Sequence, residues 1–286
     1  MTGTAPSRVL VFDSGVGGLS VAGCIHQQLP AAELVYLADN AGFPYGDQPE
    51  SVVVERCCSL IAEALAQLPC DVIVVACNTA STVVLPHLRA MTTVPVVGVV
   101  PAVKPAAEKT RNRRIGLLAT PATIRRPYLD NLVNEFAGDC YVERIGHPDL
   151  VRWVENSVGG MDVPRDALAE AVSGFRKAGV DTVVLGCTHY PLLLEALRAT
   201  LPEVEFWVDS GDAIARRVGY LLDGQGERPR TDMGNVKPCE PVRAALFSGP
   251  VPQGLASYMA SLGLTPHEVF GYWPGGAESA TATGSV

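Results

Sequence analysis

The chain has 286 residues, more than one compact core usually holds, and this length indicates two domains of ordinary size. Hydrophobic residues make up 48% of the chain, so its apolar content suffices for both cores. The formal net charge is −8 and the lysines and arginines do not cluster, which argues against nucleic acid as the main ligand.

The cellular compartment is indicated by what the sequence lacks. Residues 1–8 are polar, and no apolar run has the length of a signal peptide or of a membrane-spanning helix, so we expect a cytoplasmic chain without a membrane contact. In that reducing compartment, the eight cysteines are interpreted as thiols. Because no C-x-x-C pair occurs and the five histidines are scattered, no metal site is predicted.

The first predicted element is a buried strand over residues 8–12, which ends at Asp13 and leads through Ser14 and a glycine-rich turn into a helix. Glycines at such a turn let the backbone approach an anionic group at the helix N-terminus. The spacing matches neither the G-x-G-x-x-G nucleotide fingerprint nor a P-loop. A tight turn capped by Ser14 is the alternative interpretation, but the carboxylate of Asp13 at the end of the strand is harder to explain by packing.

The next elements continue an alternation of strands and helices. A strand over residues 34–38 reaches Asp39, and a loop over 42–47, rich in turn residues, is expected at the carboxyl edge of the sheet. A helix over 50–67, the strand before Cys77, a helix near 82–90 and a strand over 94–100 follow. This β-α-β-α-β-α-β order predicts a parallel sheet with right-handed crossovers.

Two similar segments each place a cysteine at the end of a strand. Residues 71–81 read DVIVVACNTAS and residues 181–191 read DTVVLGCTHYP, so an aspartate lies six positions before both Cys77 and Cys187. A short continuous apolar run is typical of a buried parallel strand, and ligands bind at the carboxyl ends of such strands. A single free cysteine is usually a small buried hydrophobe, but this repetition favours a functional pair.

Other elements repeat as well, because residues 114–120 resemble 8–14 and residues 204–209 resemble 94–99. Helices are expected over 150–155 and 166–178, with at least two more helical segments between 211 and 262. The repeats predict an α/β fold of two similar lobes, each a mostly parallel sheet flanked by helices. We expect a pseudo-twofold relation between the lobes, with the active site in the cleft between them.

Five motifs make the chain resemble the glutamate racemases, two-cysteine enzymes that use no cofactor and supply D-glutamate for peptidoglycan. In the family's order, these motifs are VFDSGVGG at 11–18, AD and PYG at 38–39 and 44–46, CNTAS at 77–81, ATPAT at 119–123 and GCTHYP at 186–191. The chain departs from the family over 147–155, where His147 replaces a leading Cys, and Asp149 and Arg152 replace apolar residues. Glu155 of this segment is kept.

The resemblance implies that the C-terminal part returns to the first lobe. The expected domains are 1–100 with 211–273 as the first lobe and 101–210 as the second, followed by a disordered tail over 274–286. It also implies glutamate as the small-molecule partner, with no cofactor and no metal. Members of the family differ in oligomeric state and in activation by cell-wall precursors, so a homodimer stays open.

Racemising an amino acid requires removal of the α-proton on one face and delivery of a proton on the other, so two acid/base groups must flank the substrate. By resemblance, these groups are Cys77 and Cys187, with Asp13 supporting Cys77 and His189 supporting Cys187. Backbone amides that follow Asp13 and the two cysteines are the expected donors to the substrate carboxylate. The residues assigned to substrate binding are Asp13, Ser14, Tyr45, Gly46, Asn78, Thr79, Thr120, Thr123, Thr188 and His189, and Asp39 and Glu155 are assigned to support.

Three alternatives remain open. An aspartate or hydantoin racemase would share the fold and the thiol pair, but aspartate racemases carry Glu at the position of His189. A thiol hydrolase would use one cysteine and leave the second unexplained. A two-lobed amino-acid-binding protein would bind glutamate without exchanging its α-proton.

Overall fold

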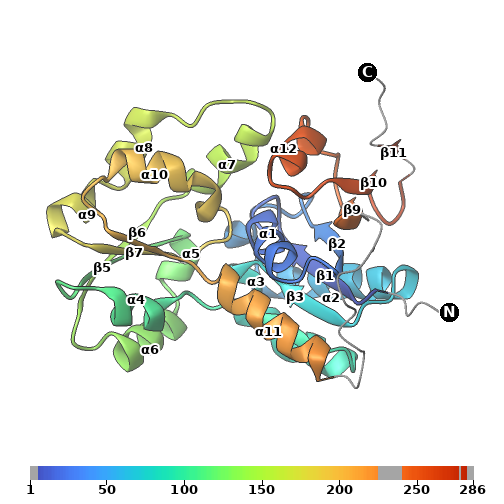
Figure 1. Cartoon of the computed structure of the whole chain (residues 1–286), viewed down its shortest axis with the longest axis horizontal. Helices are drawn as coiled ribbons and strands as arrows, with labels where there is room; N and C mark the ends of the chain where they lie inside the picture. The colour runs from blue at the N-terminus through green and yellow to red at the C-terminus, as the bar shows by residue number, and fades with distance from the viewer. Residues whose placement is uncertain (1–5, 225–239, 277, 282–286) are drawn as a thin grey trace.

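The computed structural model describes residues 6–224, 240–276 and 278–281, and within them the chain forms two β-sheets covered by helices (Figure 1). The larger sheet has the strand order β11-β10-β9-β2-β1-β3-β4. Neighbouring strands are parallel except for β11, which is antiparallel to β10. The bounds are β1 Arg8–Asp13, β2 Glu33–Ala38, β3 Val72–Val75, β4 Val96–Gly98, β9 Val242–Phe247, β10 Pro266–Gly271 and β11 Glu278–Thr281.

The smaller sheet repeats the central part of the larger one. Its order is β6-β5-β7-β8, all parallel, so β5 and β7 take the places that β1 and β3 hold in the order β2-β1-β3-β4. This recurrence agrees with the repeats in the sequence. Together the sheets confirm the predicted α/β fold of two lobes. The bounds are β5 Arg114–Ala119, β6 Tyr141–Gly146, β7 Thr182–Leu185 and β8 Phe206–Val208.

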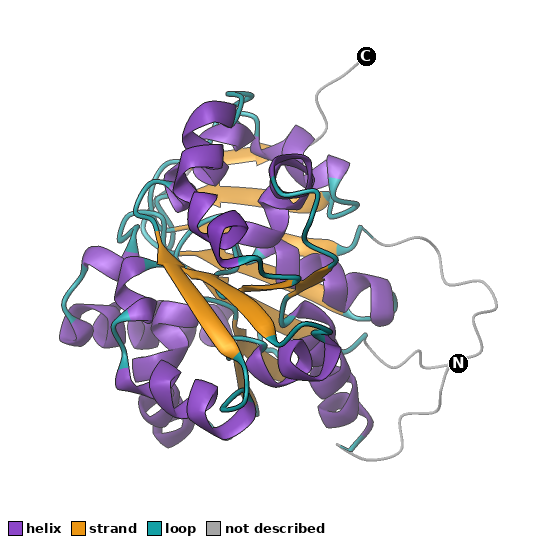
Figure 2. Ribbon diagram, turned by 90° about the vertical axis from the view of Figure 1, so that its left-hand side faces the viewer, coloured by secondary structure: helices purple, strands orange, loops and turns teal. Residues whose placement is uncertain are grey.

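Helices lie on both faces of the sheets (Figure 2). Those that pack on the larger sheet or at its edge are α1 Leu19–Gln28, α2 Glu50–Gln67, α3 Asn78–Met91, α11 Gly211–Asp223 and α12 Leu255–Ser261, with the 3₁₀ turn η1 Tyr45–Asp47. The part of the chain that carries the smaller sheet contains α4 Val103–Lys109, α5 Pro121–Ile124, α6 Pro127–Phe136, α7 Leu150–Val158, α8 Arg165–Ala171, α9 Ser173–Ala178, η2 Tyr190–Leu193 and α10 Leu194–Thr200.

Strand β3 is apolar at every position because both of its faces are covered. Val72 and Val74 belong to the hydrophobic cluster that contains residues of α1 and α11, whereas Ile73 and Val75 belong to the cluster that contains residues of α2 and α3. All four side chains are fully buried. This two-sided burial is the physical reason for the continuous apolar run before Cys77.

The structure differs from the sequence-based expectation in several elements. Helix α3 begins at Asn78, because Cys77 has extended backbone angles and is the N-cap. The helix expected over 166–178 is two helices, α8 and α9, separated at Val172, which leaves helical geometry with ψ of 6°. Strand β9, between the helical segments expected from 211 to 262, was not predicted.

The chain returns to the larger sheet after β8, through α11, β9 and β10. We therefore propose 1–100 with 211–273 and 101–210 as the two domains. The disordered tail expected over 274–286 needs correction, because residues 278–281 form β11 and pair with β10. Residues 277 and 282–286 lie outside the described residues. Within the part of the chain that the structure describes, every helix is too short or too polar to span a membrane.

Candidate active site

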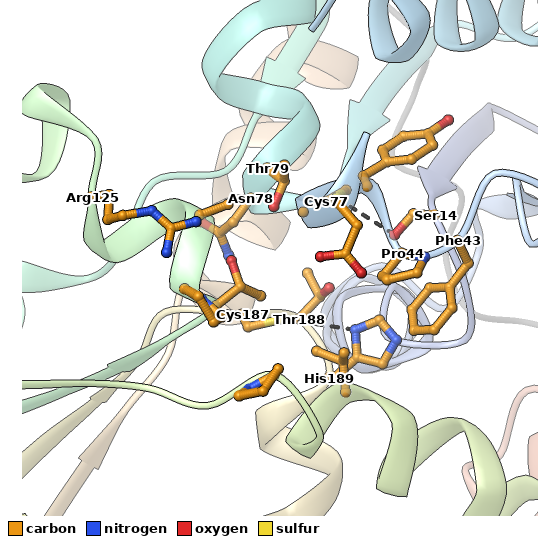
Figure 3. Close-up of a pocket in the computed structure, with 18 residues that line it drawn as sticks. Ser14, Phe43, Pro44, Cys77, Asn78, Thr79, Arg125, Cys187, Thr188 and His189 are labelled. Carbon is orange, nitrogen blue, oxygen red and sulfur yellow. Dashed lines mark hydrogen bonds between the residues drawn. The ribbon is translucent and has the colours of Figure 1, made fainter. Parts of the chain in front are cut away.

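A pocket lies where the carboxyl ends of the two sheets face each other, and both lobes line it (Figure 3). Cys77 follows β3 by two residues and Cys187 follows β7 by two residues, so the repeated strand brings one thiol from each lobe to the same cavity. Ten predicted site residues line it: Ser14, Tyr45, Gly46, Cys77, Asn78, Thr79, Thr120, Cys187, Thr188 and His189.

The first thiol, Cys77, is buried and has a hydroxyl neighbour. Its Sγ lies 3.7 Å from Oγ of Ser14. Burial, and then the charge of Asp13, raise the pKa of Cys77 to about 12, and a hydrogen bond with the amide of Ala80 only partly opposes this. With this pKa, Cys77 is a thiol at neutral pH.

The second thiol, Cys187, has an imidazole neighbour. Its Sγ lies 3.7 Å from Nδ1 of His189, whose Nε2 lies 2.7 Å from Oε1 of Glu155. Burial lowers the pKa of His189, but hydrogen bonds with Cys187 and Glu155 outweigh it and hold the pKa well above its ordinary value. The imidazole is thus protonated, and each ring nitrogen donates a hydrogen bond: one to the thiol sulfur and one to the carboxylate.

The groups that support the thiols are bonded across the cleft. Glu155, on α7, accepts a hydrogen bond from the backbone N–H of Val16, 2.8 Å away in the other lobe. Asp13, at the end of β1, accepts one from the hydroxyl of Thr188, 3.0 Å away. Burial raises the pKa of Asp13 to about 6, although the positive charge of His189 lowers it. Each lobe thus helps to hold the site groups of the other.

Two predicted residues lie behind the pocket wall. Oγ1 of Thr123 lies 3.0 Å from Oγ1 of Thr120, and its backbone N–H also bonds to that oxygen, so it holds Thr120 in place. Asp13 does not line the pocket and forms no hydrogen bond with Cys77 among the described contacts; it bonds to the N–H of Gly15 and to Thr188.

Asp39 anchors the loop that carries Tyr45 and Gly46. Its carboxylate accepts hydrogen bonds from the hydroxyl of Tyr45 at 2.6 Å, from the guanidinium of Arg56 at 2.6 and 2.7 Å, and from Ser248. Burial alone would raise the pKa of Asp39, but the bonds from Arg56 and its other partners hold it below its ordinary value. Asp39 therefore fixes the pocket wall rather than lining it.

Comparison with known proteins decides the family. Residues 11–218 match the model of the Asp/Glu/Hydantoin racemase family. A glutamate racemase of Shewanella loihica is 47% identical over 217 residues, which are 76% of this chain and 82% of that protein. A glutamate racemase of Shewanella woodyi is 42% identical over 260 residues, 91% of this chain and 96% of that protein. The chain belongs to the Asp/Glu/hydantoin racemase family.

Solved structures of racemases support the same conclusion. Escherichia coli glutamate racemase, in a complex with L-glutamate and the activator UDP-MurNAc-ala, has a TM-score of 0.83 at 42% identity, with 93% of this chain and 99% of that chain covered. The Bacillus anthracis isoform RacE1 has a TM-score of 0.74 at 29% identity, with 91% and 96% covered. The resemblance inferred from the motifs is thereby confirmed.

The departures from the racemase pattern lie around α7. The ring of His147 lies 5.5 Å from that of Trp153, and its Nδ1 accepts a hydrogen bond from the N–H of Asp149, the N-cap of α7. Arg152 lies 3.5 Å from Asp47 in the loop of the other lobe. None of the three replaced residues lines the pocket.

Sequence reasoning missed several residues of the racemase pocket. Phe43 and Pro44 line it next to the predicted Tyr45, and the ring of Phe43 lies 5.7 Å from that of His189. Phe43 could have been found from the sequence, because it directly precedes the PYG motif at 44–46 in the same loop. The remaining lining residues are Asp47, Pro121, Ala122, Arg125, Pro148 and Val151.

Proposed function

We propose that the chain interconverts L- and D-glutamate by removing the α-proton with one thiol and returning a proton from the other, without a cofactor. The observation that carries this proposal is that Cys77 and Cys187, from opposite lobes, line one pocket. The racemase family and the glutamate racemases at 42–49% identity support glutamate as the substrate. The product D-glutamate serves peptidoglycan synthesis.

The different surroundings of the two thiols fit a two-base reaction. Burial and Asp13 raise the pKa of Cys77, so this thiol holds a proton that it can donate, whereas the imidazolium of His189 is a hydrogen-bond donor beside the sulfur of Cys187. Cys187 then removes the α-proton of L-glutamate and Cys77 delivers a proton to the opposite face. The reverse reaction starts with Cys77 on D-glutamate.

The carbanion formed in this step needs donors at the substrate carboxylate. Cys77 is the N-cap of α3, so the free amides of the first turn of this helix, including those of Asn78 and Thr79, are available at the pocket. Oδ1 of Asn78 is buried and has no hydrogen-bond partner among the described residues. A substrate ammonium or amide donor would satisfy it.

Particular residues favour a glutamate racemase over the alternative functions. His189, at the position where aspartate racemases carry Glu, favours glutamate over aspartate. A thiol hydrolase would leave one of the two pocket thiols without a role. A protein that only binds amino acids is distinguished from a racemase by experiment. Location in the cytoplasm and assembly as a homodimer stay predictions.

The proposal is tested by circular dichroism of L-glutamate incubated with the purified protein and no added cofactor. We expect the signal to fall to zero as the racemate forms. Stable L-glutamate with measurable binding would indicate a binding protein, and turnover of aspartate or a hydantoin in place of glutamate would indicate another racemase of this fold.

A further inference from the structure

Tyr36 is a fully buried tyrosine to which neither the motifs nor the proposed reaction assigns a role. Side chains alternate across a strand, so Leu34, Tyr36 and Ala38 of β2 face the hydrophobic cluster that also contains residues of α1. The ring of Tyr36 packs there, 6.3 Å from the ring of Phe247. A phenylalanine would bury the same ring without a polar group, so the hydroxyl requires an explanation of its own.

The hydroxyl of Tyr36 bonds to the turn between β1 and α1. It donates a hydrogen bond of 2.6 Å to the carbonyl of Gly15. Burial, together with the charges of Asp13 and Glu155, holds the pKa of Tyr36 well above its ordinary value. The hydroxyl therefore keeps its proton and acts as a donor.

The same turn packs closely against the groups that support Cys187. A β-carbon added at Gly15 would collide with the carboxylate of Glu155, and one added at Gly17 would collide with the imidazole of His189. Glycine permits this approach, but it leaves the backbone free to adopt other conformations. The position of the turn therefore depends on the hydrogen bonds that hold it.

One peptide group connects Tyr36 with Glu155. The carbonyl of Gly15 and the N–H of Val16 belong to the same trans peptide, so they point in opposite directions. The carbonyl accepts the hydrogen bond from Tyr36, and the N–H donates to Oε1 of Glu155 at 2.8 Å. The orientation of this peptide group thus sets where the carboxylate of Glu155 is held.

The connection continues to the thiol of the second lobe. Oε1 of Glu155, which accepts the peptide N–H, lies 2.7 Å from Nε2 of His189. Nδ1 of the same ring lies 3.7 Å from Sγ of Cys187 (Figure 3). A continuous chain of hydrogen bonds therefore runs from Tyr36 in the first lobe to Cys187 in the second, and bonds in such a chain polarise one another.

We propose that Tyr36 is a positioning residue, which fixes the peptide group of the turn and so holds Glu155 and the imidazole of His189 in place beside Cys187. This inference rests on the proposed function. Tyr36 does not line the pocket, so it acts through these groups and not on the substrate. Its effect should be larger on the reaction of L-glutamate, because the chain ends at Cys187.

The test measures the turnover numbers of Tyr36→Phe from pure L-glutamate and from pure D-glutamate. The turnover number from L-glutamate should fall about three- to tenfold, the size expected for one buried hydrogen bond, and that from D-glutamate less than about twofold. Because the equilibrium constant is one, KM for L-glutamate should fall relative to KM for D-glutamate by the same ratio. A merely structural role, which reduces the amount of folded protein, would lower both turnover numbers equally.

Two further variants show whether the effect passes through His189. Adding Tyr36→Phe to His189→Asn should leave the ratio of the two turnover numbers as it is in His189→Asn alone, because the chain is already broken. Tyr128→Phe removes a hydroxyl on α6, outside the pocket, and should keep the wild-type ratio. Equal losses from both enantiomers in Tyr36→Phe, or a further change of the ratio in the double variant, would overturn the assignment.

A readout without turnover separates this inference from the proposed function. In protein with ¹⁵N-labelled histidine, His189→Asn identifies the ring resonances of His189 by their loss. Tyr36→Phe should move the Nε2 resonance of His189, and Tyr128→Phe should leave it in place. An unmoved resonance in Tyr36→Phe would contradict the chain of hydrogen bonds, whereas failure of the proposed function is seen as a wild type that racemises neither enantiomer.

Discussion

The two halves of the pocket present the same thiol in different surroundings. Cys77 has a serine hydroxyl at 3.7 Å, and burial together with the charge of Asp13 raises its pKa. Cys187 has at the same distance an imidazole nitrogen of His189, a ring that is protonated and bonded to Glu155. The repeated strand order places the two thiols in equivalent positions, whereas the residues around each thiol differ in charge.

This difference distinguishes the roles of the two thiols in the proposed reaction. In the proposed mechanism, Cys77 holds a proton and Cys187 acts as the base when L-glutamate reacts, and the charges beside the two thiols, the carboxyl group of Asp13 and the imidazolium of His189, differ in sign. Since the equilibrium constant between enantiomers is one, kcat/KM must be equal for both enantiomers at every pH. The difference between the two sides therefore has to be measured from the turnover numbers of the two enantiomers or from the reactivity of each thiol.

The largest expected effect follows replacement of either thiol. Cys77→Ala and Cys187→Ala should each lower racemisation about 10³-fold or more, because a general acid or base contributes 10²- to 10⁴-fold and a proton must cross from one side to the other. The assay is circular dichroism of glutamate. Cys58→Ala, on α2 outside the pocket, is the matched control and should keep the wild-type rate. A single-thiol variant near that rate would remove its cysteine from the reaction.

A smaller and one-sided effect is expected for His189→Asn. The replacement removes the cation beside Cys187, so the turnover number from L-glutamate should fall about tenfold to a hundredfold and that from D-glutamate by less. Because the equilibrium constant is fixed, the remaining loss must appear in KM. Initial rates from each pure enantiomer measure both quantities. Equal losses in the two turnover numbers would show that His189 does not act on the Cys187 side.

Asp13→Asn should change the reactivity of the other thiol. The charge of Asp13 raises the pKa of Cys77, so its removal should lower that pKa and increase alkylation of Cys77 by iodoacetamide at pH 8 several-fold. Burial, the larger cause, persists, so the thiol should still react more slowly than a free one. Mass spectrometry of the peptide that contains Cys77 gives the rate. Slower labelling in Asp13→Asn would contradict the conclusion that the charge of Asp13 raises the pKa of Cys77.

No change is expected when a chelator is added. Among the described residues no group of three or more His, Cys, Asp or Glu side chains could hold a metal ion, and no lysine lines the pocket to form a Schiff base. Racemisation in excess EDTA should equal that in its absence, and the protein should show no absorbance band above the aromatic region. A chelator-sensitive rate would overturn the cofactor-free reaction.

The strands and both thiols could be predicted because their signal is local. Strand β7, like β3, is buried along its whole length, so burial appears in the sequence as an apolar run that stops before the cysteine. Asn78, Thr79 and Thr188 follow directly and reach the pocket through the same geometry. The seven described cysteines are free thiols, as expected, and Cys239 lies outside the described residues.

Roles that depend on distant partners could not be predicted. Asp39 receives a hydrogen bond from Ser248, 209 positions away, at the end of the strand β9 that the sequence did not reveal. Arg125 and Arg126 are adjacent and identical in type, and only the fold shows that one faces the pocket while the other pairs with Glu50. Sequence patterns report which residues are buried, but they do not report which residues meet across the cleft.

The most direct test of the two-sided reaction is proton exchange in D₂O with single-thiol variants, followed by NMR of the α-position. In Cys187→Ala, Cys77 should still exchange the α-proton of D-glutamate and leave L-glutamate unlabelled, and Cys77→Ala should label only L-glutamate. Neither variant should racemise at an appreciable rate. If a single variant labels both enantiomers equally, the two thiols do not divide the faces of the substrate between them and the proposed mechanism is wrong.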